Sequence, residues 1–468
     1  MTSLNKIAIL SASALALATT AALADDNTVF STQTGENNSA LVTQSGVGAN
    51  AAGSSTHALT QNGKGNRITI SQSATDSRNG RGNNVGTGAT DKTSAAFKGL
   101  SQQGDGNTVA VTQSGERQNL YQLQQAGNGN AATVSQSGSF NGISSISQSA
   151  DGNAATVTQS GSQNLIGRSQ YRALPRATQG ETESGIYQSG GKNVLTISQT
   201  GTKNQVNVAR QDSTGYLTGN TATLTIDGSY TGSADFSGGF AAGSGFGNYA
   251  YHTVGLEQGV VRQTGSNSLN YTITNNNNSY AFQQNGTGTI RGATAGTGNQ
   301  IAIGQELNST ADLNVTGDSN NIGVYQKTNT AAVAAAKADI TVVGNRNNLG
   351  VSQTQNGNAT SSITVSLYGD GNNSSNLGGF TGDAGSVFFS RTPGLIEQAG
   401  DNNSINLTVG TAGSNSNDNL FAFRQSSGNN TIVGSIKGNN NQVVVSQSGG
   451  AMTHFTQVGS FNNIGVKQ

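Results

Sequence analysis

The sequence of 468 residues contains no cysteine, which excludes disulfides, iron–sulfur clusters and thiolate zinc sites. It has only 2 prolines and a formal net charge of +0, whereas disordered chains usually combine low hydrophobicity with abundant proline or high net charge. Disorder of the whole chain is therefore not expected. A neutral chain without a basic stripe also lacks the electrostatic footprint of a nucleic-acid-binding protein.

Apolar residues are scarce as well. Hydrophobic residues make up 32% of the chain and aromatic residues 5%, while glycine alone occupies 66 positions. An ordinary globular chain of this length would form roughly two to four domains, each with its own core. This composition is too poor in apolar side chains for such cores, and it favours a narrow core shared between repeated layers.

The first residues predict a secretory signal peptide. Lys6 precedes an apolar run over residues 7–18, and Ala22-Leu23-Ala24 forms a small-x-small cleavage site. The alternative is a membrane anchor, but Thr19 and Thr20 end the run before the roughly 20 apolar residues that a spanning helix needs. We therefore expect cleavage near Ala24, no stable membrane span, and a secreted chain in the extracellular space or at the cell surface.

The most regular feature is the pattern Gln-x-Gly-x-x-Asn-x5-Gln, whose two glutamines are 11 positions apart. Degenerate copies keep the spacing, with Val409 and Ile436 in place of a glutamine. The complete copies comprise Gln33, Gly35, Asn38 and Gln44; Gln61, Gly63, Asn66 and Gln72; Gln102, Gly104, Asn107 and Gln113; Gln125, Gly127, Asn130 and Gln136; Gln159, Gly161, Asn164 and Gln170; Gln188, Gly190, Asn193 and Gln199; and Gln457, Gly459, Asn462 and Gln468.

The residues between the asparagine and the second glutamine alternate between apolar and polar. Val109 and Val111 share one parity with Asn107 and Gln113, and the residues between them take the other parity. This period of two predicts a β-strand with one apolar face. The Gly-x-x segment predicts a turn, because glycine tolerates positive φ. The chain is thus expected to reverse about every 11 residues.

Two half-units make one predicted layer. Gln102, Gln125 and Gln148 follow one another at intervals of 23 positions. Parallel layers about 4.8 Å apart would let equivalent amides bond along the stack. A buried amide without a partner would cost roughly 1–3 kcal/mol, so the inward Asn and Gln are understandable as ladders. We predict an all-β solenoid of stacked strand-turn-strand layers, each of 22–23 residues, with loop insertions.

The repeats divide the chain into four parts. After the signal peptide of residues 1–24, a regular block covers 25–211, a segment rich in glycine and aromatic residues covers 212–257, and a degenerate block covers 258–468. The third segment has two interpretations: a flexible surface insertion, which we favour because Gly/Ser-rich segments mostly act as connectors, or an aromatic adhesive patch.

No group of residues suggests catalysis or metal binding. His57, His252 and His454 fall outside the inward positions of complete repeats and have no neighbouring carboxylate in a ligand pattern. The Asp105-Gly106-Asn107 type of turn differs from the nine-residue repeat of calcium β-rolls. We expect no catalytic residue, cofactor or metal.

The turn pattern followed by five residues and glutamine resembles the curlin repeat of bacterial curli subunits, over most of 33–211 and more loosely over 258–468. The resemblance implies a functional amyloid that self-assembles into fibres for adhesion and biofilm matrix. It also implies two partners, a nucleator and an outer-membrane secretion channel, and it leaves open whether the chain is a major subunit or the nucleator. By the same resemblance, the repeated Gln and Asn drive self-assembly.

Two alternatives remain beside the fibre subunit. One is a secreted β-solenoid adhesin that does not polymerise. The other is a carbohydrate-active β-helix enzyme, which would need acid, base or metal groups that converge. We rank them in that order.

Overall fold

The computed structural model describes residues 27–75, 82–87, 99–167, 184–243, 258–329, 336–357, 361–387 and 392–468. The expected signal peptide, His252 and Gln170 lie outside these residues. The chain forms two compact units, which meet between Tyr230 and Thr231. Both are built from stacked parallel strands, so the predicted all-β solenoid is confirmed. No helix among the described residues is long and apolar enough to cross a membrane.

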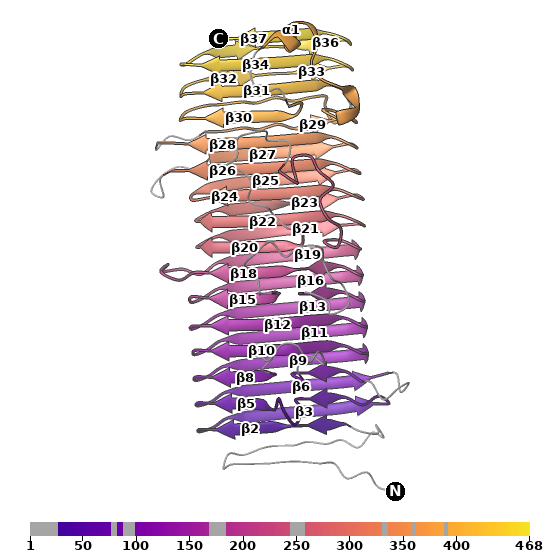
Figure 1. The fold of residues 1–468 in the computed structure, drawn as a ribbon, viewed down its shortest axis with the longest axis vertical. Coiled ribbons are helices and arrows are strands. Elements are labelled where there is room, and N and C mark those ends of the chain that lie inside the picture. The colour runs from indigo at the N-terminus through magenta and orange to yellow at the C-terminus, as the bar shows by residue number, and fades with distance from the viewer. Residues whose placement is uncertain are drawn as a thin grey trace. The chain divides into compact units, whose positions relative to one another are not determined.

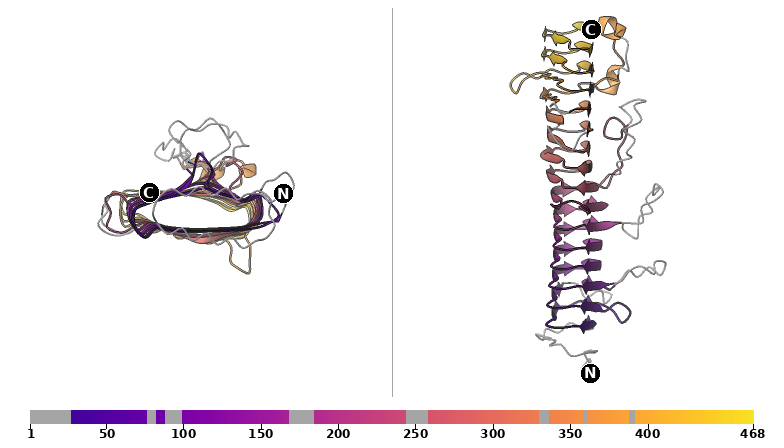
Figure 2. Two further views of the ribbon diagram at one scale, coloured as in Figure 1. Left: turned by 90° about the horizontal axis from the view of Figure 1, so that it is seen from below. Right: turned by 90° about the vertical axis from the view of Figure 1, so that its left-hand side faces the viewer.

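In the first unit, two parallel sheets, here called sheet A and sheet B, face each other across the core (Figures 1 and 2). Sheet B consists of β3 (Ser39–Gly46), β6 (Arg67–Ala74), β9 (Thr108–Glu116), β11 (Ala131–Ser139), β13 (Ala154–Ser162), β16 (Val194–Thr202) and β19 (Thr221–Ser229). Sheet A consists of β1 (Thr28–Val29), β2 (Ser31–Thr34), β4 (Ala51–Ala52), β5 (Leu59–Asn62), β7 (Asn84–Val85), β8 (Leu100–Gln103), β10 (Asn119–Ala126), β12 (Gly142–Ser149), β14 (Leu165–Ile166), β15 (Gly185–Ser189), β17 (Gln205–Val206) and β18 (Val208–Asp212).

Each layer contributes one strand to sheet B and either one long or two short strands to sheet A, and equivalent positions lie opposite one another. Gln125 pairs with Gln102 on one side and with Gln148 on the other, which is the expected step of 23 residues. Gln148 is in turn opposite Gln188, 40 positions later, because additional residues separate β14 from β15 in the sequence. The insertions therefore lengthen a layer without shifting its alignment.

The strands of sheet A depart from simple alternation. In β10 both Leu120 and Leu123 are fully buried, while Tyr121 and Gln122 between them are only half-buried. One extra residue thus occupies the strand, and β12 contains the same extra residue, so the two strands still pair one to one. This residue explains why successive layers are 23 rather than 22 residues apart.

Part of the segment expected to be an insertion belongs to the stack. Strand β19 lies within residues 212–257 and pairs over its whole length with β16. Its inward residues Ala222, Leu224 and Ile226 are buried. The expectation missed this strand because Ile226 stands where the repeat has glutamine.

In the second unit, sheet A consists of β20 (Val260–Gly265), β22 (Ser279–Gly286), β24 (Gln300–Glu306), β26 (Asn321–Thr328), β28 (Asn348–Gln355), β30 (Leu395–Ala399), β31 (Leu420–Ser426), β34 (Gln442–Ser448) and β37 (Asn463–Lys467). Sheet B consists of β21 (Ser268–Thr274), β23 (Thr289–Ala295), β25 (Ser309–Thr316), β27 (Ala336–Val343) and β29 (Leu367–Tyr368), followed by the short pairs β32 (Thr431–Val433) with β35 (Met452–His454) and β33 (Ile436–Lys437) with β36 (Gln457–Val458).

The outer face of sheet A in the second unit is covered by other parts of that unit. Phe240 is fully buried and contacts the backbone of β28 at Gly350, where an added Cβ would lie 2.1 Å from the Phe240 ring. A segment that contains η4 (Ser375–Leu377) and α1 (Gly382–Ser386) packs in the same way against β37, with Ala384 beside Val444. The glycines of these strands therefore make room for a second layer of chain.

Candidate functional site: the asparagine and glutamine columns

Two continuous columns of glutamine run along the core of the first unit. In sheet A the column is Gln33, Gln61, Gln102, Gln125, Gln148, Gln188 and Gln211, and in sheet B it is Gln44, Gln72, Gln113, Gln136, Gln159 and Gln199. In every step the Nε2 of one glutamine donates to the Oε1 of the next along the sequence, at 2.6–3.0 Å. All of these amides except that of Gln44 are buried.

The asparagines of the repeat form a different ladder. The column is Asn38, Asn66, Asn107, Asn130, Asn153, Asn193 and Asn220, and each Oδ1 accepts from the backbone N–H of the next member at 2.9–3.0 Å. The Nδ2 of Asn107 donates to the carbonyl of Gly127 in the next layer at 2.8 Å. The amide-to-amide bonds that the sequence led us to expect occur at the last two steps, where Asn193 Nδ2 donates to Asn153 at 2.9 Å and Asn220 Nδ2 donates to Asn193 at 3.0 Å. In earlier layers the asparagine Nδ2 bonds the backbone of the turn, as at Asn107.

The repeat glycines adopt the backbone conformation that the turn requires. Gly35, Gly63, Gly104, Gly127, Gly161, Gly190 and Gly459 all have positive φ, between 73° and 133°. At Gly127 an added Cβ would lie 2.4 Å from the carbonyl oxygen of Ala150 in the next layer. The glycine is therefore needed both for its dihedral angle and for the close approach of successive turns.

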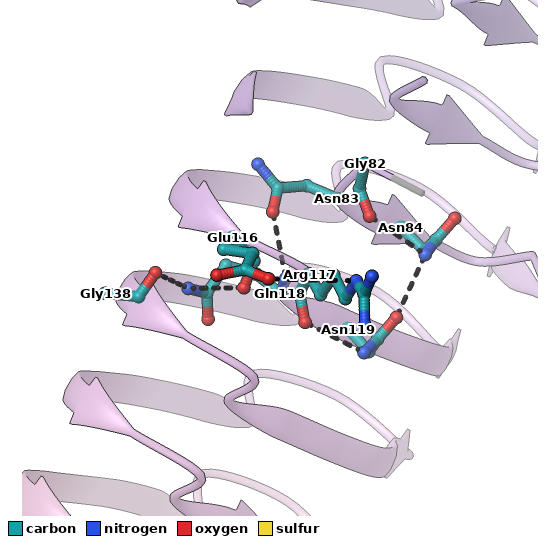
Figure 3. A network of polar contacts seen from close by, with 8 residues as sticks. All are labelled: Gly82, Asn83, Asn84, Glu116, Arg117, Gln118, Asn119 and Gly138. Atoms are coloured by element: carbon teal, nitrogen blue, oxygen red, sulfur yellow. Dashed lines mark hydrogen bonds and ion pairs between the residues drawn. The ribbon is translucent and has the colours of Figure 1, made fainter. Parts of the chain in front are cut away.

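A second polar column, which the sequence analysis missed, lies at the opposite turn. Its members are Asn50, Asn83, Gln118, Asn141, Asn164 and Asn204, all buried. Figure 3 shows one step, in which Asn83 Oδ1 accepts from the backbone N–H of Gln118 at 2.9 Å and Gln118 Nε2 donates to Gly138. The available signal was a Gln-x-Gly-x-x-Asn spacing, as in Gln136 to Asn141, that is followed by six rather than five residues before the next glutamine, Gln148. Asn164 belongs to this column, bonded to Asn141 at 3.0 Å.

The second unit retains only one of the two glutamine columns over its full length. In sheet A the column is Gln263, Gln284, Gln305, Gln326, Gln353, Gln398, Gln425, Gln447 and Gln468, with amide-to-amide distances of 2.7–3.3 Å. In sheet B the equivalent positions hold Ile273, Thr294, Val315, Val342, Leu367, Val409 and Ile436. An apolar column needs no amide partners, so the degenerate repeats still form a stack.

The last complete repeat contributes one glutamine to each of these two columns. Gln457 belongs to the sheet B column, where it lies opposite Ile436 and not opposite another glutamine. Its Nε2 donates to the Gln442 carbonyl at 3.1 Å. Asn462 bonds to Asn441 at 3.0 Å through its backbone N–H, and Gln468 accepts from Gln447 at 3.0 Å.

A further ladder, on the solvent side, follows the turns. Asp105, Asn128 and Asp151 occupy successive layers, and each Oδ1 accepts a backbone N–H from the preceding layer at 2.7–2.8 Å. Aspartate and amide therefore alternate in the first unit. Two aspartates in adjacent layers would bring like charges to about 4.8 Å.

The described residues offer little for catalysis. They contain no group of three His, Cys, Asp or Glu that could hold a metal ion. His57 contacts Thr56 Oγ1 at 3.0 Å, and His454 is exposed on β35.

One groove, of about 480 Å³, lies on the second unit, and Tyr325, Ser352, Glu397 and Arg424 are among its lining residues. Burial raises the pKa of Glu397, and the charge of Arg424 opposes this shift. Glu397 is the only carboxylate in the lining, whereas most glycoside hydrolases use two.

No family model matches the chain, and the search of curated proteins found no relative.

Proposed function

We propose that the chain is the structural subunit of a secreted, curli-like fibre that grows by stacking of layers and serves adhesion and biofilm matrix. The observation that carries this proposal is the set of buried amide columns, in which each Gln and Asn is bonded to its equivalent in the neighbouring layers. Such columns are typical of cross-β assemblies, where identical side chains stack along the fibre axis.

The direction of the ladders supports assembly in one orientation. In every glutamine–glutamine step of both columns of the first unit, the residue nearer the N-terminus donates and the residue nearer the C-terminus accepts. Copies that continue these bonds must stack head to tail. Head-to-tail contacts generate open filaments when the rotation between copies does not close a ring. We therefore propose a polar fibre.

The free energy of growth would come from repeated small terms. Each intramolecular hydrogen bond contributes about 0.5–1.5 kcal/mol net, and a strand left without a neighbour presents a row of free backbone groups that pair readily with another chain. A nucleator and a dedicated export channel remain part of the proposal as partners.

The test compares inward and outward substitutions in one layer. We expect replacement of Gln102, Asn107 and Gln113 by alanine to lengthen the lag and slow the growth measured by thioflavin fluorescence. The matched control replaces the outward Thr108 and Thr112, both exposed on β9, and should assemble like the wild type. Equal effects of the two variants would contradict a role of the amide columns in assembly.

A further inference from the structure

The outer face of sheet B in the first unit is an uninterrupted, regular array of small hydroxyl side chains, here called the hydroxyl face. Its two central columns are Leu41, Thr69, Ala110, Thr133, Thr156, Thr196 and Thr223, and Thr43, Ser71, Thr112, Ser135, Thr158, Ser198 and Thr225. Twelve of these fourteen residues are serine or threonine. None of the fourteen is charged, and all of them are half-buried or exposed.

The strands of sheet B in the first unit are continuous, whereas those of sheet A are interrupted. In sheet A one layer is divided between β4 and β5, another between β7 and β8, and another between β14 and β15. By contrast, each strand of sheet B in this unit is eight or nine residues long without a break. The free, flat face is thus a property of sheet B.

We propose that the hydroxyl face is a lateral interface between two copies of the chain, paired face to face about a two-fold axis. A two-fold interface requires a surface complementary to itself. The two central columns meet this condition, because they carry no charge and bring no like charges together across the axis. At the margins of the face, the charged residues Arg67 on β6 and Asp227 on β19 are opposite in sign. Small side chains in straight columns also interdigitate closely, as in the dry contacts between paired cross-β sheets.

The size of the face fits a stable pair. Seven strands about 4.8 Å apart span roughly 34 Å, and seven residues at about 3.3 Å span roughly 23 Å. The product is roughly 780 Å² for each partner, close to the about 800 Å² that a standard interface buries per partner. The outer face of sheet A is a poorer candidate in this unit, since several of its strands are short and interrupted.

Lateral pairing is separate from axial growth, so it does not depend on the proposed fibre. The solenoid itself supplies the hydroxyl face, while axial growth uses the ends of the amide columns. A chain that forms lateral dimers but no fibres would contradict the proposed fibre and support the interface. A chain that forms only single, unpaired filaments would support the fibre and contradict the interface.

Charge substitutions test the interface directly. In the full chain, Thr112→Lys with Thr158→Lys places lysines two layers apart on the hydroxyl face. Ser101→Lys with Ser147→Lys is the matched control, at the same spacing on the outer face of sheet A. We expect sedimentation velocity to give a dimer for the wild type and the control and a monomer for the hydroxyl-face variant, with unchanged circular dichroism for all three. A wild type that is monomeric, or two variants that behave alike, would overturn the proposal.

Crosslinking gives a second readout that does not depend on charged variants. The chain has no cysteine, so a single introduced thiol reports one contact. We expect Ser135→Cys, near the centre of the hydroxyl face, to form a disulfide-linked dimer on mild oxidation much faster than Gln124→Cys on sheet A. Equal rates would overturn the proposal. So would a monomer that binds crystalline polysaccharide or ice through the hydroxyl face.

Discussion

Replacement of one glutamine inside a column should cost more than replacement at its end. Gln136 accepts from Gln113 and donates to Gln159, both at 2.8 Å. Gln136→Leu leaves a donor and an acceptor without their amide partner, and each such buried group costs about 1–3 kcal/mol. We expect the free energy of unfolding to fall by about 2–6 kcal/mol, toward the lower end because Gln113 Nε2 keeps the Asn84 carbonyl at 3.1 Å.

Gln199 provides the matched comparison. It accepts from Gln159 at 2.8 Å, but the next layer holds Ile226 at the equivalent position. Gln199→Leu therefore leaves one amide group without its partner and should cost about 1–3 kcal/mol. Thr133→Ala, on the exposed face, should change stability by less than about 0.5 kcal/mol.

The assay is urea unfolding of the chain before fibres form, at one fixed protein concentration for all variants, combined with amide hydrogen exchange of β11 and β13. Exchange is needed because stacked repeats depart from two-state unfolding, so a local loss of protection is more informative than one midpoint. Protection should fall more around Gln136→Leu than around Gln199→Leu. If the internal substitution cost no more than the terminal one, the amide ladder would not be a main source of stability.

Three further predictions concern the turns and the groove. Gly127→Ala should lower the free energy of unfolding by several kcal/mol. Gly129→Ala, where an added Cβ meets nothing within 4 Å, should cost only its backbone strain of about 1–2 kcal/mol. Equal melting temperatures of the two variants would refute the steric argument. Asn128→Asp would place three carboxylates in adjacent layers. It should lower the free energy of unfolding by roughly 1 kcal/mol per adjacent pair at pH 7, less at high salt, and not at pH 3. A loss that is independent of pH and salt would contradict this. Burial raises the pKa of Glu397, so the folded state favours the protonated carboxyl. The stability of the wild type relative to Glu397→Gln should therefore fall as pH rises from the ordinary pKa of 4.5 through the raised value. A constant difference in melting temperature would show that burial does not act on this carboxyl.

The sequence predicted the architecture because its main cause is local and repeated. The alternation around Val109 and Val111 and the turn at Gly104 specify a strand and its reversal, and their recurrence specifies the stack. The step from Gln102 to Gln125 then gave the correct pairing of layers. Inward asparagine and glutamine, which are unfavourable in an ordinary core, signalled that neighbouring layers supply their partners.

What the sequence did not reveal depends on the details of the second sheet and of the turns. The extra residue between Leu120 and Leu123 alters the spacing to the following glutamine, so the column through Asn83 and Gln118 did not match the pattern. Every step of the glutamine columns in the first unit carries an amide-to-amide bond, whereas the asparagine column has such bonds only between Asn153, Asn193 and Asn220, and the sequence pattern did not predict this difference. The strand around Leu224 was hidden by the loss of one glutamine.

The degenerate repeats show how a stack tolerates such losses. In sheet B of the second unit the seven equivalent positions from Ile273 to Ile436 all lose the amide. Six of them are apolar, as with Val315 opposite Val342, and the seventh, Thr294, bonds through its hydroxyl to Tyr271. A whole column of apolar side chains packs against itself, whereas a single apolar residue within a glutamine column leaves amides unpaired. The unit of substitution is therefore the column rather than the residue.

The most direct test of the account is incubation of the purified mature chain, followed by thioflavin fluorescence and by X-ray diffraction from aligned fibres. Stacking that continues the layers predicts a rise in fluorescence and a sharp reflection at about 4.8 Å along the fibre axis. A protein that stays monomeric for days and gives no such reflection would contradict the proposed fibre.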